Sequence, residues 1–350
     1  MKINKKPFGT LSNGKKVELY TLSSGDITLS ISTLGATLTS LYTPSRKTGV
    51  ADILLGYSTL SGYAADPVFF GATIGRFANR IGGARFTIDD KTYTLFKNDG
   101  ENCLHAGLKN FGRQVWSAEQ YEDKGGVYVR FELNSPSNDE GFPGNLNAAV
   151  SYGLTNSNEM AVIYEATVDA PSPVNFTNHA YFNLAGEGRG DTLSHELIIH
   201  ASEYLPVDEH SIPTGEVAKV ELTPFDFRLW KPIGMDIDKT APGAASGRAG
   251  YDHCYVITGI PGKLRPAAEV FERASGRIMR VFTTQPGIQF YTGNYLHNIA
   301  GKSGSVYNKH AGFCLETQHF PDSPNKPQFP SCIYTPDRKY AEKAAFKFDW

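Results

Sequence analysis

The sequence predicts an all-β fold, a sandwich or barrel of large size, from three features. Thirty-five glycines and twenty prolines interrupt the 350-residue chain every few residues, and 12% of the residues are aromatic. Between these interruptions lie short segments rich in β-branched and aromatic residues, several of which alternate apolar and polar side chains. A period of two is typical of a half-buried strand. Many short strands at regular spacing favour a sandwich or a barrel.

Five segments along the chain could form regular secondary structure. The fifth of them, Lys339–Phe346, contains helix-forming residues but is short, so its sequence fits a helix or a strand. The other four have a clear strand pattern and are, in chain order, Val127–Leu133, Met160–Val168, Glu196–His200 and Ile278–Thr283.

No segment of the sequence indicates a domain boundary. Asp238–Gly250 is rich in small residues and turn formers, but it runs directly into Tyr251–Val256, which has the composition of an ordered segment. Ser135–Gly144 is a loop that is too short to be a linker. We therefore expect one continuous domain over residues 1–350.

Composition excludes several classes of function. The chain has 34 basic and 36 acidic side chains and a net charge of −2, so it has no basic field for nucleic acid or an anionic membrane. No apolar run is long enough to cross a bilayer. The four cysteines, Cys103, Cys254, Cys314 and Cys332, stand singly and are expected to be reduced, buried thiols. The basic start lacks a following apolar region, which favours a cytoplasmic location, although an already removed leader would leave the same sequence.

Most standard catalytic motifs are missing. The sequence contains no H-E-x-x-H, no phosphate-binding G-x-x-x-x-G-K-[ST] and no G-x-S-x-G. Gly186–Gly190 is close to a dinucleotide-binding loop, but Asp191 stands in place of the third glycine. The nine histidines show no metal-ligand spacing, so we expect no metal and no nucleotide cofactor.

Polar side chains in apolar or amide-rich surroundings are the candidates for chemistry. His179, in TNHAYFNL, fits an imidazole that donates a proton near neutral pH, or a core histidine bonded to a carbonyl. Glu316, in FCLETQ, has two interpretations: a buried glutamate with a functional role, or a strand residue that faces solvent. The hydrogen-bonding side chains in IGRFANRI, NCLHAG and YDH suit sugar hydroxyls, and each alone also fits a structural salt bridge or a turn.

Seven motifs together resemble the aldose 1-epimerases, also called galactose mutarotases. They are GRFANRI, LHAG, TNHAYFNLAG, YLPVDEHSIPTGE, GYDHC, TTQPGIQFYTGN and FCLETQHFPDSPNKPQFP, and the resemblance runs from about Phe8 to Phe348. It implies a single large β-sandwich of the galactose mutarotase-like supersandwich type. It also implies a cofactor-free enzyme that interconverts the α and β anomers of free aldohexoses such as galactose and glucose.

The resemblance also implies roles for individual residues. Glu316 matches the catalytic base of the family and His179 its catalytic acid. Tyr181 is expected to line the same pocket. Cys254 stands where the family usually has asparagine or a similar residue, outside the matched catalytic positions. The positions that match sugar-binding residues are Asn79, Arg80, His105, Asp252 and Gln289.

Mutarotation needs one base and one acid. The base removes the proton of the C1 hydroxyl while the acid protonates the ring oxygen, and the two exchange roles when the ring closes again. We expect the two side chains roughly 5–7 Å apart across one sugar ring, with Phe290 and Tyr181 against its C–H faces. The acid limb of the pH profile should report the carboxylate and the alkaline limb the imidazolium. The partner is a free aldose, and we expect a monomer.

Three alternatives remain open at this point. A glycoside hydrolase would use Glu316 and Asp252 as a carboxylate pair. A sugar-binding protein without catalysis would keep the pocket alone. A relative that acts on hexose 6-phosphates would need further arginine or lysine around the pocket. The preferred sugar does not follow from the sequence.

Overall fold

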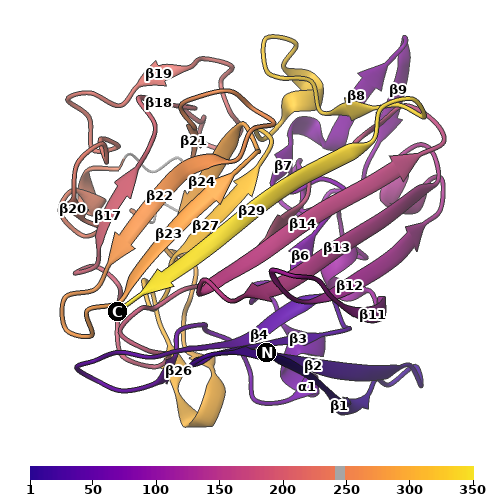
Figure 1. Ribbon diagram of the computed structural model, residues 1–350. Coiled ribbons are helices and arrows are strands. Elements are labelled where there is room, and N and C mark those ends of the chain that lie inside the picture. The colour runs from indigo at the N-terminus through magenta and orange to yellow at the C-terminus, as the bar shows by residue number, and fades with distance from the viewer. Residues whose placement is uncertain (241–248) are drawn as a thin grey trace.

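Antiparallel sheets form the framework of the computed structural model, which describes residues 1–240 and 249–350 (Figure 1). The predicted all-β class is confirmed. The largest sheet has nine strands in the order β11-β12-β13-β14-β29-β23-β22-β17-β20. Their bounds are Ser117–Glu122 (β11), Gly126–Ser135 (β12), Leu146–Thr155 (β13), Glu159–Val168 (β14), Tyr340–Asp349 (β29), Ile278–Thr283 (β23), Arg265–Phe271 (β22), Glu196–Ile199 (β17) and Lys231–Pro232 (β20).

Two five-stranded sheets complete the main framework. One contains, in spatial order, Ala218–Lys219 (β19), Glu203–Tyr204 (β18), Asp252–Val256 (β21), Gly287–Tyr291 (β24) and Cys314–Gln318 (β27). The other contains Lys2–Thr10 (β1), Lys16–Ser24 (β2), Ile27–Ser32 (β3), Thr37–Thr43 (β4) and Ala51–Asp52 (β5).

Short ladders and turns connect these sheets. The two-stranded ladders pair Arg80–Ile81 (β7) with Cys103–Leu104 (β10), Thr73–Ile74 (β6) with Thr177–Asn178 (β16), Arg85–Ile88 (β8) with Lys91–Thr94 (β9), Ser172–Pro173 (β15) with Ile333–Tyr334 (β28), and Ile299–Ala300 (β25) with Val306–Tyr307 (β26). Within the described ranges the α-helix is Leu60–Ala65 (α1), and the 3₁₀ turns are Gly82–Ala84, Phe111–Arg113, Asp139–Gly141, Ile237–Lys239, Lys302–Gly304 and Ser323–Asn325.

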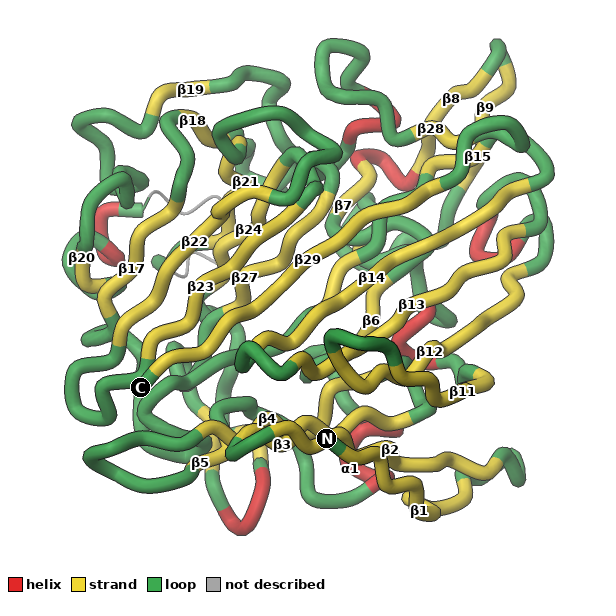
Figure 2. Tube along the Cα trace, viewed as in Figure 1, coloured by secondary structure: helices red, strands yellow, loops and turns green. Residues whose placement is uncertain are grey.

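The predicted strands all lie in the nine-stranded sheet, as β12, β14, β17 and β23. The ambiguous segment Lys339–Phe346 belongs to strand β29, because it is paired on both sides, with β14 and with β23. Figure 2 shows how little helix remains among the strands. Of the predicted turn-rich stretch Asp238–Gly250, residues 241–248 lie outside the described part of the chain.

The core lies between the nine-stranded sheet and the sheet that contains β21, β24 and β27, which pass behind β22, β23 and β29 in Figure 1. Ile288, Phe290 and Leu315 belong to one buried cluster with Met279 and Phe346 of the larger sheet. Side chains alternate along a strand, so the intervening residues of β24 and β27 project from the opposite face. That face is where the polar residues of these strands gather.

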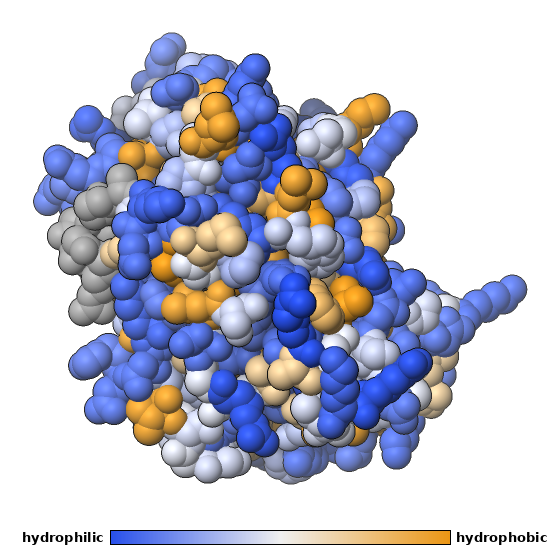
Figure 3. Space-filling model, turned by 90° about the vertical axis from the view of Figure 1, so that its left-hand side faces the viewer, coloured by the Kyte–Doolittle hydropathy of each residue, from blue (hydrophilic) through white to orange (hydrophobic). Residues whose placement is uncertain are grey.

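The surface has mixed hydropathy. On the face shown in Figure 3, apolar groups are interspersed with hydrophilic ones. No helix in residues 1–240 and 249–350 has both the length and the apolar composition of a membrane span.

Six histidines are buried in this fold, and five of them are at most 6% exposed: His105, His179, His195, His253 and His319. Burial lowers the pKa of His179, His195, His253 and His319 to about 4, and that of His105 well below its ordinary value of 6.5. These rings are therefore neutral in the folded protein at pH values where an unfolded chain protonates them.

Acidification below pH 6.5 should therefore destabilise the fold. Between pH 6.5 and about 4 the unfolded chain binds protons that these rings exclude, so the free energy of unfolding falls as the pH falls. Each histidine contributes up to about 1.4 kcal/mol per pH unit in that window. Urea titrations between about pH 7 and 5 measure the slope. His195→Gln keeps an acceptor for the Leu184 N–H. It should reduce the slope by the contribution of one histidine, about 1.4 kcal/mol per pH unit.

His297→Gln, which replaces an exposed histidine, is the matched control and should keep the slope of the unmodified chain. Equal slopes for the His195 variant and the unmodified chain would contradict a neutral, proton-excluding His195.

Candidate active site

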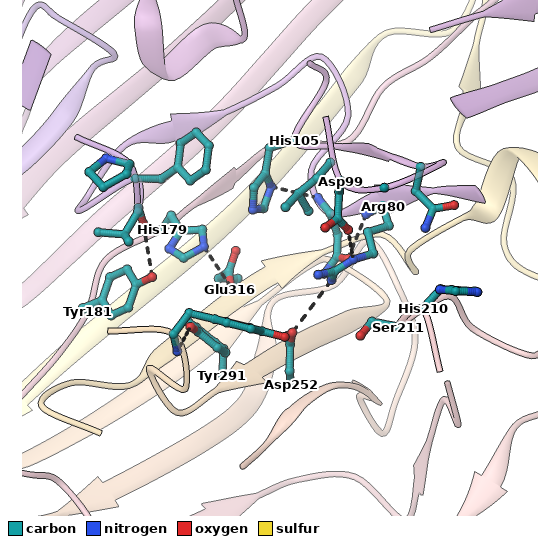
Figure 4. Close-up of a pocket in the computed structure, with 18 of the residues that line it drawn as sticks. Arg80, Asp99, His105, His179, Tyr181, His210, Ser211, Asp252, Tyr291 and Glu316 are labelled. Carbon is teal, nitrogen blue, oxygen red and sulfur yellow. Dashed lines mark hydrogen bonds and ion pairs between the residues drawn. The ribbon is translucent and has the colours of Figure 1, made fainter. Parts of the chain in front are cut away.

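A cavity of about 640 Å³ opens against the polar face of β21, β24 and β27 (Figure 4). Of the predicted site residues, Asn79, Arg80, His105, His179, Tyr181, Asp252 and Glu316 line it, whereas Gln289 lies outside its lining. The other lining residues are Pro67, Val68, Phe69, Asp99, Gly100, Glu101, Asn102, Leu104, His210, Ser211, Tyr291 and Tyr295.

Strand register places the carboxylates on one wall. Asp252 of β21 lies opposite Tyr291 of β24, and Gln289 of β24 lies opposite Glu316 of β27. Residues two apart on a strand share a face, so these four side chains project together from the sheet. The same alternation turns Phe290 into the core, where its ring stacks on Tyr251. The expectation that Phe290 contacts the sugar is therefore wrong, and the aromatic residue of β24 in the cavity is Tyr291.

The β7–β10 ladder supplies the facing wall. Asn79 and His105 have positive φ angles, 66° and 53°, and hold each other through two hydrogen bonds. The backbone N–H of His105 donates to the carbonyl of Asn79, and the backbone N–H of Asn79 donates to Nδ1 of His105, both at 3.1 Å. Because Nδ1 accepts, the proton of the neutral ring lies on Nε2. His105 therefore offers a donor to a sugar hydroxyl.

Arg80 is held between two carboxylates. Its Nε donates to Asp99 Oδ2 at 2.7 Å, and its Nη1 lies 3.8 Å from Asp252 Oδ2. Burial lowers the pKa of Arg80, but Asp252 and Asp99 outweigh burial and leave it above its ordinary value. The guanidinium is therefore charged and fixed in direction at the cavity wall.

Gln289 lies beneath the cavity and supports it. It is 3% exposed, and its Nε2 donates to Asp252 Oδ1 at 2.7 Å. With Arg80 near the other oxygen, both oxygens of Asp252 have a partner. The sequence predicts Gln289 as a sugar-binding residue, but in this structure it contacts Asp252, which does line the cavity.

His179 and Glu316 face each other in the buried part of the cavity. His179 Nε2 lies 3.8 Å from Glu316 Oε1, and both side chains are less than a tenth exposed. The expected separation of roughly 5–7 Å is too long. The two sugar oxygens that exchange protons are bonded to the same carbon, so their partners can lie this close. Glu316 Oε2 is buried without a hydrogen-bond partner among the described residues.

Burial favours the neutral form of both groups. The pKa of Glu316 is raised well above its ordinary value by burial and then by Asp252, with Arg80 opposing. The pKa of His179 is lowered to about 4 by burial, which outweighs its own backbone carbonyl and Asp252. These shifts predict the opposite assignment of the pH limbs from the one expected from the sequence. His179 is expected to gain a proton at the lower pH and Glu316 to lose one at the higher pH, with the pair titrating as a unit.

Aromatic rings hold the imidazole of His179. Its ring stacks on Tyr181 with centroids 5.1 Å apart, and the steeply inclined rings of His105 and Tyr291 have their centroids 5.2 and 6.3 Å from its own. The Tyr181 hydroxyl donates to the carbonyl of Val68 at 3.1 Å, which fixes the stacking ring.

Sequence reasoning missed several residues of the cavity. Tyr291 follows from strict alternation along β24 once Gln289 is placed, but Asp99 and Phe69 come from loops without a periodic pattern. The four cysteines are buried and free, as predicted, and Cys314 lies against His179.

Three side chains of the site could ligate a metal. Ligand atoms of His179, Cys314 and Glu316 lie within 4.8 Å of one another. The sulfur, however, is 3.6 Å from Nδ1 of His179, whereas the carboxylate faces Nε2. An ion bound by His179 uses one ring nitrogen, so contacts on two different nitrogens fit hydrogen bonding better than one shared ion.

Comparison with known proteins gives the same assignment along nearly the whole chain. Residues 18–347 match the family described as Aldose 1-epimerase. The chain is 43% identical over 343 residues to a galactose mutarotase of Rattus norvegicus, which covers 97% of each chain. It is 38% identical over 339 residues to an aldose 1-epimerase of Escherichia coli K12, which covers 96% of each.

Solved structures agree in fold. The crystal structure of galactose 1-epimerase from Lactobacillus acidophilus NCFM superimposes with a TM-score of 0.86 at 28% identity, over 99% of this chain and 98% of that one. The family match and the identity to full-length relatives confirm the resemblance carried by the sequence motifs. The chain is therefore a member of the aldose 1-epimerase family of isomerases.

Proposed function

We propose that Glu316 and His179 are the proton-transfer pair of a mutarotase that interconverts the α and β anomers of free aldohexoses such as galactose and glucose. The observation that carries this proposal is the 3.8 Å approach of a buried carboxyl and a buried imidazole inside a sugar-sized cavity. Family membership supplies the reaction class.

The reaction moves two protons and breaks one bond. Glu316 takes the proton of the C1 hydroxyl while His179 gives its Nε2 proton to the ring oxygen, and the C1–O5 bond opens to an aldehyde. Rotation about C1–C2 presents the other carbonyl face. On closure the ring oxygen returns its proton to His179, and Glu316 returns its proton to O1. Throughout the open-chain state Glu316 is therefore a neutral carboxylic acid and His179 is a neutral imidazole.

The electrostatics of the site support this cycle. Carboxylate with imidazolium, and carboxylic acid with neutral imidazole, contain the same number of protons. Burial favours the second arrangement, which is the one that ring opening produces. The raised pKa of Glu316 makes its carboxylate a stronger base, and the lowered pKa of His179 makes its imidazolium a stronger acid.

The other cavity residues suit a neutral sugar. Asn79, Arg80, His105 and Asp252 offer donors and acceptors to hydroxyls. Arg80 is the only lysine or arginine among the described lining residues, and it is already paired with two carboxylates. That arrangement disfavours a phosphorylated hexose, which would need an uncommitted cation.

The hydrolase and binding-only alternatives fit less well. A glycoside hydrolase needs Glu316 and Asp252 as its working pair, but Asp252 is held by Gln289 and Arg80 while Glu316 faces His179. A protein that only binds sugar does not need a carboxyl and an imidazole held 3.8 Å apart, an arrangement that suits proton transfer.

Replacing either member of the pair should stop catalysis with little effect on binding. Glu316→Gln removes the proton acceptor and His179→Asn removes the donor, so each should lower kcat by about 10²–10⁴-fold. KM should change much less, and the double variant should be little worse than either single one. Polarimetric decay of freshly dissolved α-glucose and α-galactose measures the rates.

Circular dichroism of each variant controls for loss of the fold. A folded single variant that keeps more than about a tenth of the normal rate would show that its residue is not the proton-transfer group.

The pH profile of kcat/KM should be bell-shaped with its acid limb below the ordinary histidine pKa. Activity falls at low pH when the pair takes a second proton, an event governed by the His179 pKa of about 4. It falls at high pH when the pair loses its last proton, an event governed by the raised pKa of Glu316. Initial rates across the pH range, with the folded fraction measured at each pH, give the two limbs. An acid limb centred near pH 6.5 in fully folded protein would contradict this order.

A further inference from the structure

The ring of His179 is contacted at both nitrogens, and the mechanism above uses one of them. Nε2 faces Glu316, whereas Nδ1 lies 3.6 Å from the sulfur of Cys314. Stacking on Tyr181 restrains the plane of the ring but leaves open a flip by half a turn about the Cβ–Cγ bond, which would exchange each nitrogen with a ring carbon. The contact of Nδ1 with Cys314 is therefore an independent restraint that keeps Nε2, and not a ring carbon, facing the carboxyl.

Cys314 is placed for this contact by the sheet. It begins β27, lies directly opposite Tyr291 of β24, and shares a face with Glu316 two residues later. Its side chain is completely buried. Burial, and then Glu316 and Asp252, raise the pKa of this thiol well above its ordinary value, so the sulfur is neutral.

We propose that Cys314 is a positioning residue whose sulfur accepts the Nδ1–H of His179, so that Nε2 is the nitrogen that exchanges its proton with the sugar ring oxygen. The proposal rests on the role proposed above for His179. In a neutral imidazole the hydrogen bond made by one nitrogen decides the protonation of the other. With the proton held on Nδ1, Nε2 can lose its proton to the sugar and regain it without rotation of the ring.

A sulfur partner in place of a carboxylate also affects the acidity of the His179 imidazolium. Histidines that act as general bases commonly donate Nδ1–H to a carboxylate, which stabilises the imidazolium. A thiol sulfur is a weak acceptor and carries no charge here, so it orients the ring with little stabilisation of the imidazolium. His179 therefore stays a strong acid toward a weakly basic ring oxygen.

Two variants of Cys314 and one matched control test the proposal. Cys314→Ala removes the acceptor and should lower kcat by about 10-fold with little change in KM. Cys314→Ser supplies a hydroxyl oxygen, a better acceptor than sulfur. It should keep kcat within about 3-fold and move the acid limb of the pH profile upward by about half a unit. Cys332→Ala empties a thiol site of equal burial in a separate apolar cluster and should leave kcat and both limbs unchanged.

The tautomer itself is observable without turnover. ¹⁵N NMR of the histidine rings in the unmodified, sugar-free protein, assigned with His179→Asn, should show His179 protonated at Nδ1 and unprotonated at Nε2 at neutral pH. In Cys314→Ala the signal should become a mixture of tautomers. The other titratable groups around the ring, which are His105, Tyr181, Tyr291, Asp252 and Glu316, are the same in every variant.

The outcomes separate this proposal from the one on which it rests. An Nε2-protonated neutral ring in the unmodified protein, or a folded Cys314→Ala variant with normal kcat and an unshifted profile, would overturn the role of Cys314. Normal activity of His179→Asn would overturn the proposed function instead, whatever tautomer the NMR spectra show.

Discussion

The two faces of β24 and β27 impose the constraint on which both the core and the site depend. Ile288, Phe290 and Leu315 fill the core from one face, while Gln289 and Glu316 project from the other. A shift of one residue in either strand would exchange the two sets, placing a phenylalanine in the cavity and a carboxyl in the core. The energy of apolar burial therefore fixes the direction of the reactive groups as strongly as it fixes the fold.

The same pleat explains which features the sequence predicts and which it does not. Alternating segments such as β14 and β23 are recognisable because one face is buried, and motif resemblance identifies the polar residues of β21 and β27. A motif does not show whether a residue contacts the substrate or supports another residue that does. Gln289 donates a hydrogen bond to Asp252, and Asp99 accepts one from Arg80. The protonation of Glu316 and His179 depends on desolvation, which exists only once distant segments have packed.

Two neighbouring residues of β24 and β27 each keep, at the site, a buried polar atom without a partner in the described part of the chain. Glu316 Oε2 and Gln289 Oε1 are buried without hydrogen bonds within residues 1–240 and 249–350. Each such atom costs about 1–3 kcal/mol relative to a satisfied one. Of the two residues only Glu316 lines the cavity, so an acceptor that folding leaves unpaired is available to a sugar hydroxyl there.

The place of β29 in the nine-stranded sheet has a consequence for biosynthesis. Tyr340–Asp349 pairs with β14 on one side and with β23 on the other, so the sheet is interrupted at its middle until these residues have been synthesised. A ribosome-bound chain that lacks them has two half-sheets with open edges at β14 and β23, which are templates for pairing with other chains. Until β29 inserts, a nascent chain of this protein can therefore aggregate through the exposed edges of β14 and β23.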